Sequence, residues 1–168
     1  MNHFGQTTRL PNYDWTADTR MNCMHTAISQ LLEHAYAHHI QRLMLTGNFA
    51  LLAGIHTDEV DEWYLGIYID ALQWVGIVNT REMSLYADGG LVATKPYISS
   101  ANHIHMMSDY CQGCHCHWRR PVGERACPFN SLYRVFIHRH RQSLAENPRV
   151  AMMVRNWDRM PAPRRDDL

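Results

Sequence analysis

Lysine is almost absent from this sequence of 168 residues, in which Lys95 stands alone beside fifteen arginines. A long apolar run is absent too, since no stretch approaches the roughly 20 apolar residues that span a bilayer. Residues 1–20 are polar and lack the apolar core of a secretory signal peptide. We therefore expect no membrane partner and a cytoplasmic location. There is also no internal repeat and no low-complexity segment, so the sequence predicts an ordinary globular unit.

The net charge is zero, but the two signs are separated along the chain. Residues up to His117 include 5 basic and 11 acidic side chains, and those from Trp118 onward include 11 basic and 5 acidic. Arginine suits the recognition of phosphate groups, so the basic half of the chain favours contact with nucleic acid. An arginine-rich coding bias explains the same composition equally well, and both interpretations stay open.

Five cysteines are present, and without an export signal they indicate a metal site or free thiols rather than a disulfide framework. Cys111 and Cys114 form a Cys-x-x-Cys pair, and Cys127 precedes Pro128, a Cys–Pro step that is familiar from iron–sulfur ligation. A fourth ligand has to come from elsewhere, and Cys23 is the cysteine outside the loop. Competing donors inside the loop are His115, Cys116 and His117. Spacing alone is compatible with zinc, with an iron–sulfur cluster and with metal-free thiols.

Apolar residues make up 46% of the chain, enough for a substantial core, and their spacing of three and four predicts a mostly α fold. Residues 1–20 are predicted to be an irregular lead-in, and residues 21–168 one helical unit. Loops are expected over 76–97 and 111–128, where sustained periodicity is missing. The predicted helices cover residues 21–45, 48–55, 57–75, 99–110, 130–145 and a segment after 148.

Several motifs resemble those of the bacterial iron–sulfur cryptochromes and (6-4) photolyases. The longest covers residues 35–52, AYAHHIQRLMLTGNFALL. Further similar stretches are residues 62–64, 68–71, 79–80, 87–90, 95–97, 107–111, 126–130 and 147–149. The resemblance extends from about Trp15 over nearly the whole chain. It implies the C-terminal part of the helical FAD-binding domain of the photolyase/cryptochrome fold, with an iron–sulfur loop and without the antenna domain or the first part of the flavin domain.

The same resemblance implies an activity and two cofactors. Family members bind FAD and use blue light to drive electron transfer, either to repair (6-4) lesions in damaged DNA or to act as photoreceptors. A second chain that completes the flavin domain is compatible with this interpretation. Four cysteines hold a [4Fe–4S] cluster in the family, and they match Cys23, Cys111, Cys114 and Cys127. Cys116 has no counterpart among those ligands.

His38 and His39 match the active-site histidine pair of the family, where a histidine suits proton transfer near neutral pH. Their spacing continues the apolar stripe of Leu31 and Ala35, which predicts that at least one imidazole faces inward. An inward histidine is also common as a hydrogen-bonded core residue, so spacing alone does not assign the role.

The remaining site residues are implied by the resemblance. Trp15, Trp63 and Tyr64 resemble the aromatic relay that reduces the flavin, although aromatic side chains on a buried helix face commonly serve packing. The implied flavin-binding residues are Asp70, Asn79, Asp88 and Gly89. Tyr97 resembles a lesion-contacting aromatic residue that could stack on an extruded base. Arg42, one turn beyond the histidines, is placed either to meet a lesion phosphate or to be solvated. His103 is a candidate polar contact to the lesion in place of the tyrosine of the family.

Two positions depart from the family pattern. Gly76 stands where the family tends to carry an acidic residue near the flavin, and His103 stands where it carries a tyrosine. Loss of the carboxylate is expected to alter the protonation and redox properties of the flavin. The alternative interpretation is a non-enzymatic, metal-stapled module with zinc or iron–sulfur that binds nucleic acid through its arginines, or an inactive remnant.

Overall fold

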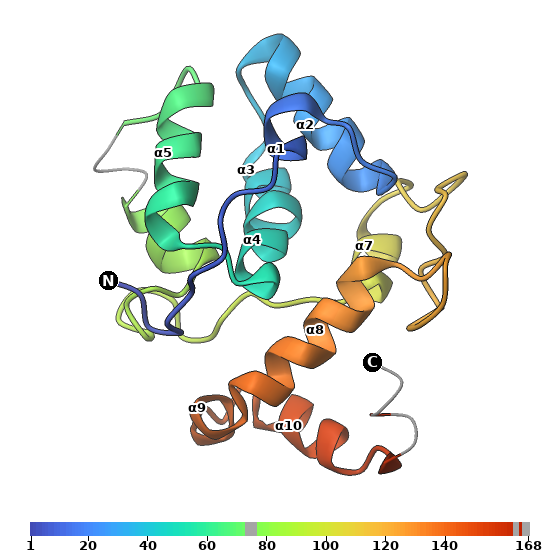
Figure 1. The fold of residues 1–168 in the computed structure, drawn as a ribbon. Helices are drawn as coiled ribbons and strands as arrows, with labels where there is room; N and C mark the ends of the chain where they lie inside the picture. The colour runs from blue at the N-terminus through green and yellow to red at the C-terminus, as the bar shows by residue number, and fades with distance from the viewer. Residues whose placement is uncertain (73–76, 163–164, 166–168) are drawn as a thin grey trace.

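The computed structural model describes residues 1–72, 77–162 and 165, and it is mostly helical (Figure 1). Within these ranges extended pairing is limited to two isolated bridges, Thr8–Ile55 and His117–Ala126. The predicted α class is confirmed. The first elements are α1 (Tyr13–Thr16), α2 (Asn22–His34), α3 (His39–Gln41), the π-helical η1 (Arg42–Gly47) and α4 (Asn48–Ala53). They are followed by α5 (Thr57–Ile67), the π-helical η2 (Ile77–Ser84), α7 (Ala101–Met107), α8 (Pro128–Arg139), α9 (Arg141–Glu146) and α10 (Ala151–Asp158).

The core runs through the middle of the molecule, where α4 contacts α8 and α8 contacts α10. Figure 1 shows α3 and α4 between α5 on one side and α7 with α8 on the other. Met24 of α2, Leu51 of α4 and Phe129 of α8 are completely buried and belong to one apolar cluster. Of the helices in the described ranges, none has the length and apolar character needed to cross a bilayer.

The single helix predicted over residues 21–45 is wrong, because the chain leaves the helix at Ala35. That residue adopts a left-handed conformation with φ of 51°, and its N–H donates to the carbonyl of Leu31. The Ala35 carbonyl in turn accepts a hydrogen bond from the N–H of Ile69, 2.8 Å away. No glycine or proline marks this break in the sequence, and Ile69, two residues after the end of α5, holds it in place through this backbone hydrogen bond.

The break predicted at Gly47 is also wrong, since η1 continues directly into α4. A Cβ atom on Gly47 would lie 2.7 Å from the Cβ of Ser84 and 2.8 Å from the carbonyl oxygen of Arg42. Gly47 is therefore required for the close approach of η1 and η2 rather than for a turn.

Helix α5 begins one residue after His56, whose Nδ1 accepts a hydrogen bond from the N–H of Asp58. It ends at Ile67, and Tyr68 is already extended, so the predicted continuation to residue 72 is wrong. The rest of that predicted helix, residues 73–75, and the Gly76 departure lie outside the described residues. The predicted loop at 76–97 contains η2, which packs against η1 and α5.

The second half of the chain follows the prediction more closely, with α7 starting after Ser100 and a long loop between α7 and α8. Helix α8 begins at Pro128, because proline suits the first helical position. Its N-cap is Cys127 and not Asn130. The Asn130 amide instead donates to the carbonyls of Trp118 and Arg120, at 2.7 and 3.2 Å. Its oxygen accepts from the N–H of Ala101. Asn130 thus ties the cysteine-containing loop to α7 and α8.

Asn48→Ala should destabilise the fold by roughly 3 kcal/mol, because the variant leaves buried polar groups without partners. The Asn48 amide is completely buried and donates to the hydroxyl and the carbonyl of Ser99, while its oxygen accepts from the Ser99 N–H. Urea unfolding followed by circular dichroism would measure the change. Asn102→Ala, at an exposed position of α7, is the matched control and should unfold at nearly the wild-type concentration. Equal midpoints for both variants would contradict the prediction.

Candidate functional site

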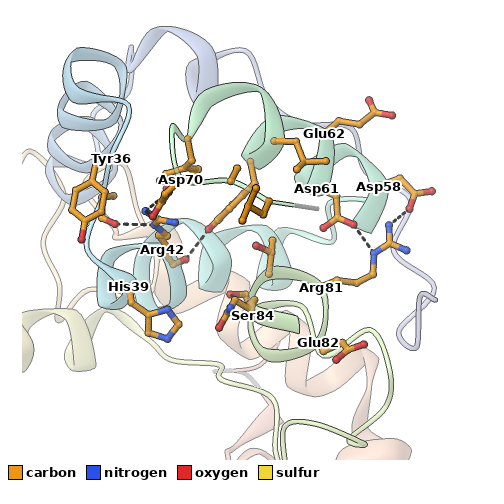
Figure 2. A pocket seen from close by; sticks show the side chains of 18 of the residues that line it. Tyr36, His39, Arg42, Asp58, Asp61, Glu62, Asp70, Arg81, Glu82 and Ser84 are labelled. Carbon is orange, nitrogen blue, oxygen red and sulfur yellow. Dashed lines mark hydrogen bonds and ion pairs between the residues drawn. The ribbon is translucent and has the colours of Figure 1, made fainter. Parts of the chain in front are cut away.

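A cavity with a volume of about 680 Å³ is lined by residues of α3, η1, α5, η2 and the segment that follows α5 (Figure 2). This volume falls within the range of ligand and cofactor sites. Five of the predicted site residues line this cavity, namely His39, Arg42, Tyr64, Asp70 and Asn79. Residues that the sequence did not single out also line it: Tyr36, Asp58, Asp61, Tyr68 and Arg81.

Arg42 and Asp70 form an ion pair on one side of this cavity (Figure 2). One terminal nitrogen of Arg42 donates to both carboxylate oxygens of Asp70, each 2.9 Å away, and Nε donates to the Ala37 carbonyl. The guanidinium also lies over the ring of Tyr68, 4.1 Å from its centroid. The residue predicted to contact a lesion and the one predicted to contact the flavin are therefore paired with each other. The Arg42 charge is therefore already balanced by the Asp70 carboxylate and by its contact with the face of the Tyr68 ring.

A second set of charges lies on the opposite side of the cavity in Figure 2. Arg81 of η2 donates through Nε to Asp61, 2.6 Å away, and through a terminal nitrogen to Asp58. Burial raises the pKa of Asp61, while the bond from Arg81 lowers it. This charged group was not predicted from the sequence; of its members, Asp58 lies in the first turn of α5, where an acidic side chain also favours the helix.

The two predicted histidines take different places. His38 precedes α3, and its Nδ1 accepts from the N–H of Ile40, 3.2 Å away, while the side chain of Gln41 accepts from the His38 N–H. This reciprocal arrangement is a capping box. His39 lines the cavity (Figure 2). Both side chains are exposed, so the inward orientation predicted from helical spacing is wrong. Helix α2 ends at His34, and its apolar face therefore does not extend to residues 38 and 39.

A row of aromatic rings leads from α5 to the Arg42 guanidinium. The ring centroids of Trp63 and Tyr64 are 5.1 Å apart, and those of Tyr64 and Tyr68 are 4.8 Å apart. Trp63 and Tyr64 are buried, and the Tyr64 hydroxyl donates to the Arg42 carbonyl, 3.0 Å away. Burial raises the pKa of Tyr64 to about 12, which keeps its hydroxyl protonated. Tyr68 was not predicted as part of the site, although it lies two residues before Asp70 in a motif that was noticed.

Trp15 is on α1 and has 52% of its surface exposed. The neighbouring Asp14 carbonyl accepts a hydrogen bond from the Trp63 indole N–H, 3.1 Å away. This bond joins α1 to α5. The three predicted relay residues are therefore one buried tryptophan, one buried tyrosine and one exposed tryptophan on an adjoining helix.

Asp14→Asn should raise the melting temperature at pH 8 and leave it nearly unchanged at pH 4. Asp14 is 3% exposed, and burial raises the pKa of its carboxyl group to about 7. An unfolded chain ionises such a group near pH 4, so between about pH 4 and 7 the unfolded state loses a proton that the folded state keeps. The free energy of unfolding falls over that window by on the order of 4 kcal/mol. Thermal unfolding of both proteins at the two pH values would measure the difference, and an equal shift at both would contradict it.

Four predicted residues lie away from the large cavity. The Asp88 carboxylate accepts hydrogen bonds from the N–H groups of Gly90 and Val92, so it stabilises a turn. Gly89 has φ of +73°, and a Cβ there would meet the His3 ring at 2.7 Å. The other two, Tyr97 and His103, are partly buried and are not among the residues that line the cavity.

The cysteines form a separate cluster beside the N-terminal end of α2, where the loop between α7 and α8 passes (Figure 1). The Asn22 N–H donates to the sulfur of Cys114, 3.4 Å away, and the Asn22 amide donates to the Tyr110 carbonyl. All five thiols line one small cavity of about 10 Å³, namely Cys23, Cys111, Cys114, Cys116 and Cys127. Cys23 of α2 therefore lines the same small cavity as the cysteines of the loop.

The thiols are gathered but not closed around an ion. In the described residues no group of three or more histidine, cysteine or carboxylate side chains is arranged to hold a metal ion. Burial raises the pKa of Cys127 to about 12 and that of Cys23 further, with contributions from the neighbouring thiols. A metal would therefore have to displace thiol protons on binding. The donor set of soft sulfur ligands suits iron–sulfur clusters and zinc.

The fold and site thus define a helical protein with a cofactor-sized cavity, a row of aromatic rings beside it and a distinct cluster of thiols. No family model matches the sequence. The chain is 50% identical over 167 residues to the "(6-4) photolyase" of Agrobacterium fabrum, an alignment that covers 99% of this chain and 33% of that protein, at its C-terminal end. It is 30% identical over 116 residues to an uncharacterized protein of Acanthamoeba polyphaga mimivirus, covering 69% of this chain and 85% of that protein. This chain belongs to the (6-4) photolyase family, and it spans about a third of the length of its bacterial relative.

Proposed function

We propose that this chain takes part in blue-light-driven, flavin-dependent repair of (6-4) lesions in DNA, or in photoreception by the same photochemistry. The observation that carries the proposal is the row of Trp63, Tyr64 and Tyr68, which leads to the Arg42–Asp70 pair at the wall of a cavity of about 680 Å³. The family membership supports the same conclusion. Bound FAD would supply the absorption of light and the electron that opens the lesion.

The residues at the cavity have roles that follow from their positions. The Asp70 carboxylate, held by Arg42, is an acceptor for an N–H or hydroxyl group of the cofactor, and Asn79 of η2 lines the same cavity. The Arg42 charge stabilises negative charge that develops in the cavity. His39 lines the cavity, and histidine is a residue type suited to proton transfer, so it is the proposed proton donor for a lesion that enters from solvent. Contacts beyond these residues would come from elsewhere in a longer polypeptide or from a second chain.

The proposal includes a [4Fe–4S] cluster on Cys23, Cys111, Cys114 and Cys127. Support comes from the gathering of these thiols from two distant segments at one cavity and from the Cys–Pro step at the start of α8. The void between the sulfurs is small, so uptake of a cluster requires the loop to move outward. Many residues of that loop are exposed, but Asn130 of α8 donates hydrogen bonds to the carbonyls of Trp118 and Arg120 within it, so this movement would have to break those bonds.

DNA is the proposed partner of the basic half of the chain. Arginines outnumber acidic residues after His117, and guanidinium groups form two parallel hydrogen bonds with phosphate. Binding to a labelled duplex should therefore weaken steeply as salt is raised.

Anaerobic reconstitution with iron, sulfide and FAD, followed by desalting and an absorption spectrum, tests the proposal. We expect the structured yellow absorption of a flavin together with a broad brown absorption that bleaches on reduction. Chemical analysis for iron, sulfide and zinc belongs to the same measurement. A folded chain that retains no flavin would contradict the flavin proposal, and one that retains zinc instead of iron would contradict the cluster proposal.

A further inference from the structure

The second part of the loop between α7 and α8 carries a concentration of positive charge. This segment, residues 117–125, is called the arginine loop below. It contains Arg119, Arg120 and Arg125, and all three side chains are exposed. Its one acidic residue is Glu124. Figure 1 shows this loop at the edge of the molecule, outside α7 and α8.

The charges of the arginine loop are not neutralised within the described part of the chain. The arginines that form ion pairs there are Arg42, Arg81 and Arg141, all outside this loop. Arg125 donates through Nε to the carbonyl of His115, 3.1 Å away, a contact that leaves its positive charge unbalanced. The loop therefore offers its guanidinium groups to an anion outside the chain, and phosphate is the group that guanidinium matches in geometry.

An aromatic stack holds one of these guanidinium groups in place. The central carbon of the Arg119 guanidinium lies over the Trp118 ring, 4.5 Å from its centroid. The Trp118 ring is in turn stacked on the imidazole of His105 in α7, with centroids 3.9 Å apart and ring planes 17° from parallel. Because the cation is positioned before any partner arrives, binding costs less side-chain entropy than it would for a mobile arginine.

The backbone of the arginine loop is anchored as well. Asn130 of α8 donates to the carbonyls of Trp118 and Arg120, at 2.7 and 3.2 Å. The N–H of His117 donates to the carbonyl of Arg125, 2.7 Å away, which brings the two ends of the loop together. The three arginines are thus presented from one tied segment rather than from an extended tail.

The loop between α7 and α8 is attached to the helix that carries His39. The Gln41 amide of α3 donates to the hydroxyl of Tyr110, 3.0 Å away, and Tyr110 lies near the start of this loop. His39 precedes Gln41 by two residues in the same short helix. A surface that contacts DNA beside the lesion can therefore extend from α3 along this loop.

We propose that the arginine loop binds the phosphate backbone of duplex DNA, as an extension of the surface that meets the lesion. The inference rests on the DNA partner included in the proposed function, and it assigns that contact to Arg119, Arg120 and Arg125 rather than to the arginines that follow α8. The Trp118 ring is engaged with His105 and Arg119, so its role is to hold the cation. Contacts of this kind position the duplex and do not read its sequence.

Fluorescence anisotropy with a labelled, undamaged duplex, measured over a range of salt concentrations on the purified chain, tests this inference. The variant Arg119→Gln/Arg120→Gln/Arg125→Gln should bind about tenfold more weakly at moderate salt. The slope of the logarithm of affinity against the logarithm of salt concentration should fall by about 3, or roughly one for each lost phosphate contact.

The matched control removes the same charge from another part of the basic half. Arg149→Gln/Arg155→Gln/Arg159→Gln changes three exposed arginines just before, within and just after α10. This variant should keep its salt slope and bind within about twofold of the wild type. Circular dichroism of both triple variants would establish that each is folded.

Trp118→Leu provides a second readout, because it keeps every charge and removes the ring beneath Arg119. The duplex should bind roughly threefold more weakly, since the guanidinium has to be ordered on binding. The salt slope should stay near the wild-type value, because the number of phosphate contacts is the same. A merely structural role of the ring would leave the affinity unchanged in folded protein.

The possible results separate the loop from the partner. Equal weakening in the two triple variants, or none in the loop variant, would overturn the assignment to the arginine loop and leave the proposed DNA partner intact. A folded wild-type chain that does not bind the duplex at low salt would overturn both. Displacement of the duplex by polyglutamate at equal charge concentration would assign the loop to an acidic protein instead. The flavin proposal is tested separately by reconstitution.

Discussion

Trp63→Phe should give a folded protein in which bound flavin is photoreduced at only a small fraction of the wild-type rate. Trp63 is the buried ring that joins α1 to the row ending at Arg42, and its centroid is 5.1 Å from that of Tyr64. A phenyl ring is far harder to oxidise than an indole, so an electron passing along the row meets a barrier at this step. Blue illumination of the flavin-loaded protein under anaerobic conditions, with a mild reductant, would measure the rate from the bleaching of flavin absorption.

The stability cost of this variant has to be separated from its effect on the relay. Loss of the indole N–H leaves the Asp14 carbonyl without that partner and a smaller ring in the core, which together cost about 2 kcal/mol. Trp157→Phe is the matched control, because Trp157 is also buried but lies on α10, away from the row. It should lose similar stability and keep its photoreduction rate. Equal rates in all three proteins would contradict a relay through Trp63.

The helical class and most helix positions could be predicted because apolar spacing reflects which face of a helix is buried. The exceptions arise from contacts that link distant segments. Ala35 leaves the helix in a left-handed conformation, and its carbonyl pairs with Ile69, thirty-four positions later. Glycine commonly marks the end of a helix, but Gly47 instead allows η1 to pack closely against Ser84 of η2. Neither the break at Ala35 nor the packing at Gly47 could be predicted from the residues next to it in the sequence.

The same distinction applies to the candidate site. Motifs identified Arg42, Asp70 and Asn79, which the structure brings to one cavity. They did not predict that Arg42 would pair with Asp70, since charge pairing depends on how the segment after α5 returns to η1. Asp88 is a turn-capping residue away from this cavity, and sequence spacing alone gave no sign of that separation.

Cys23→Ser should reduce the iron content of reconstituted protein to background, because Cys23 is one of the four proposed ligands. Cys23 of α2 is 6% exposed, and it lines one cavity with the thiols of the loop between α7 and α8. Cys116 lines the same cavity but has no counterpart among the ligands that the family resemblance implies. A hydroxyl is a poor ligand for iron in a thiolate set, because soft sulfur donors are preferred. Iron and sulfide analysis with the absorption spectrum would measure the loss.

The effect on folding separates a ligand from a core residue. Serine at this buried position costs roughly 1–3 kcal/mol from burial of a hydroxyl, and that cost is present with or without metal. A ligand role adds a second, iron-dependent part: reconstitution should raise the melting temperature of the wild type and not that of Cys23→Ser. Cys116→Ser, which removes a thiol from the same cavity, should keep the increase. Unchanged iron in Cys23→Ser would mean that α2 and the loop meet only as packed surfaces, with no inorganic core between them.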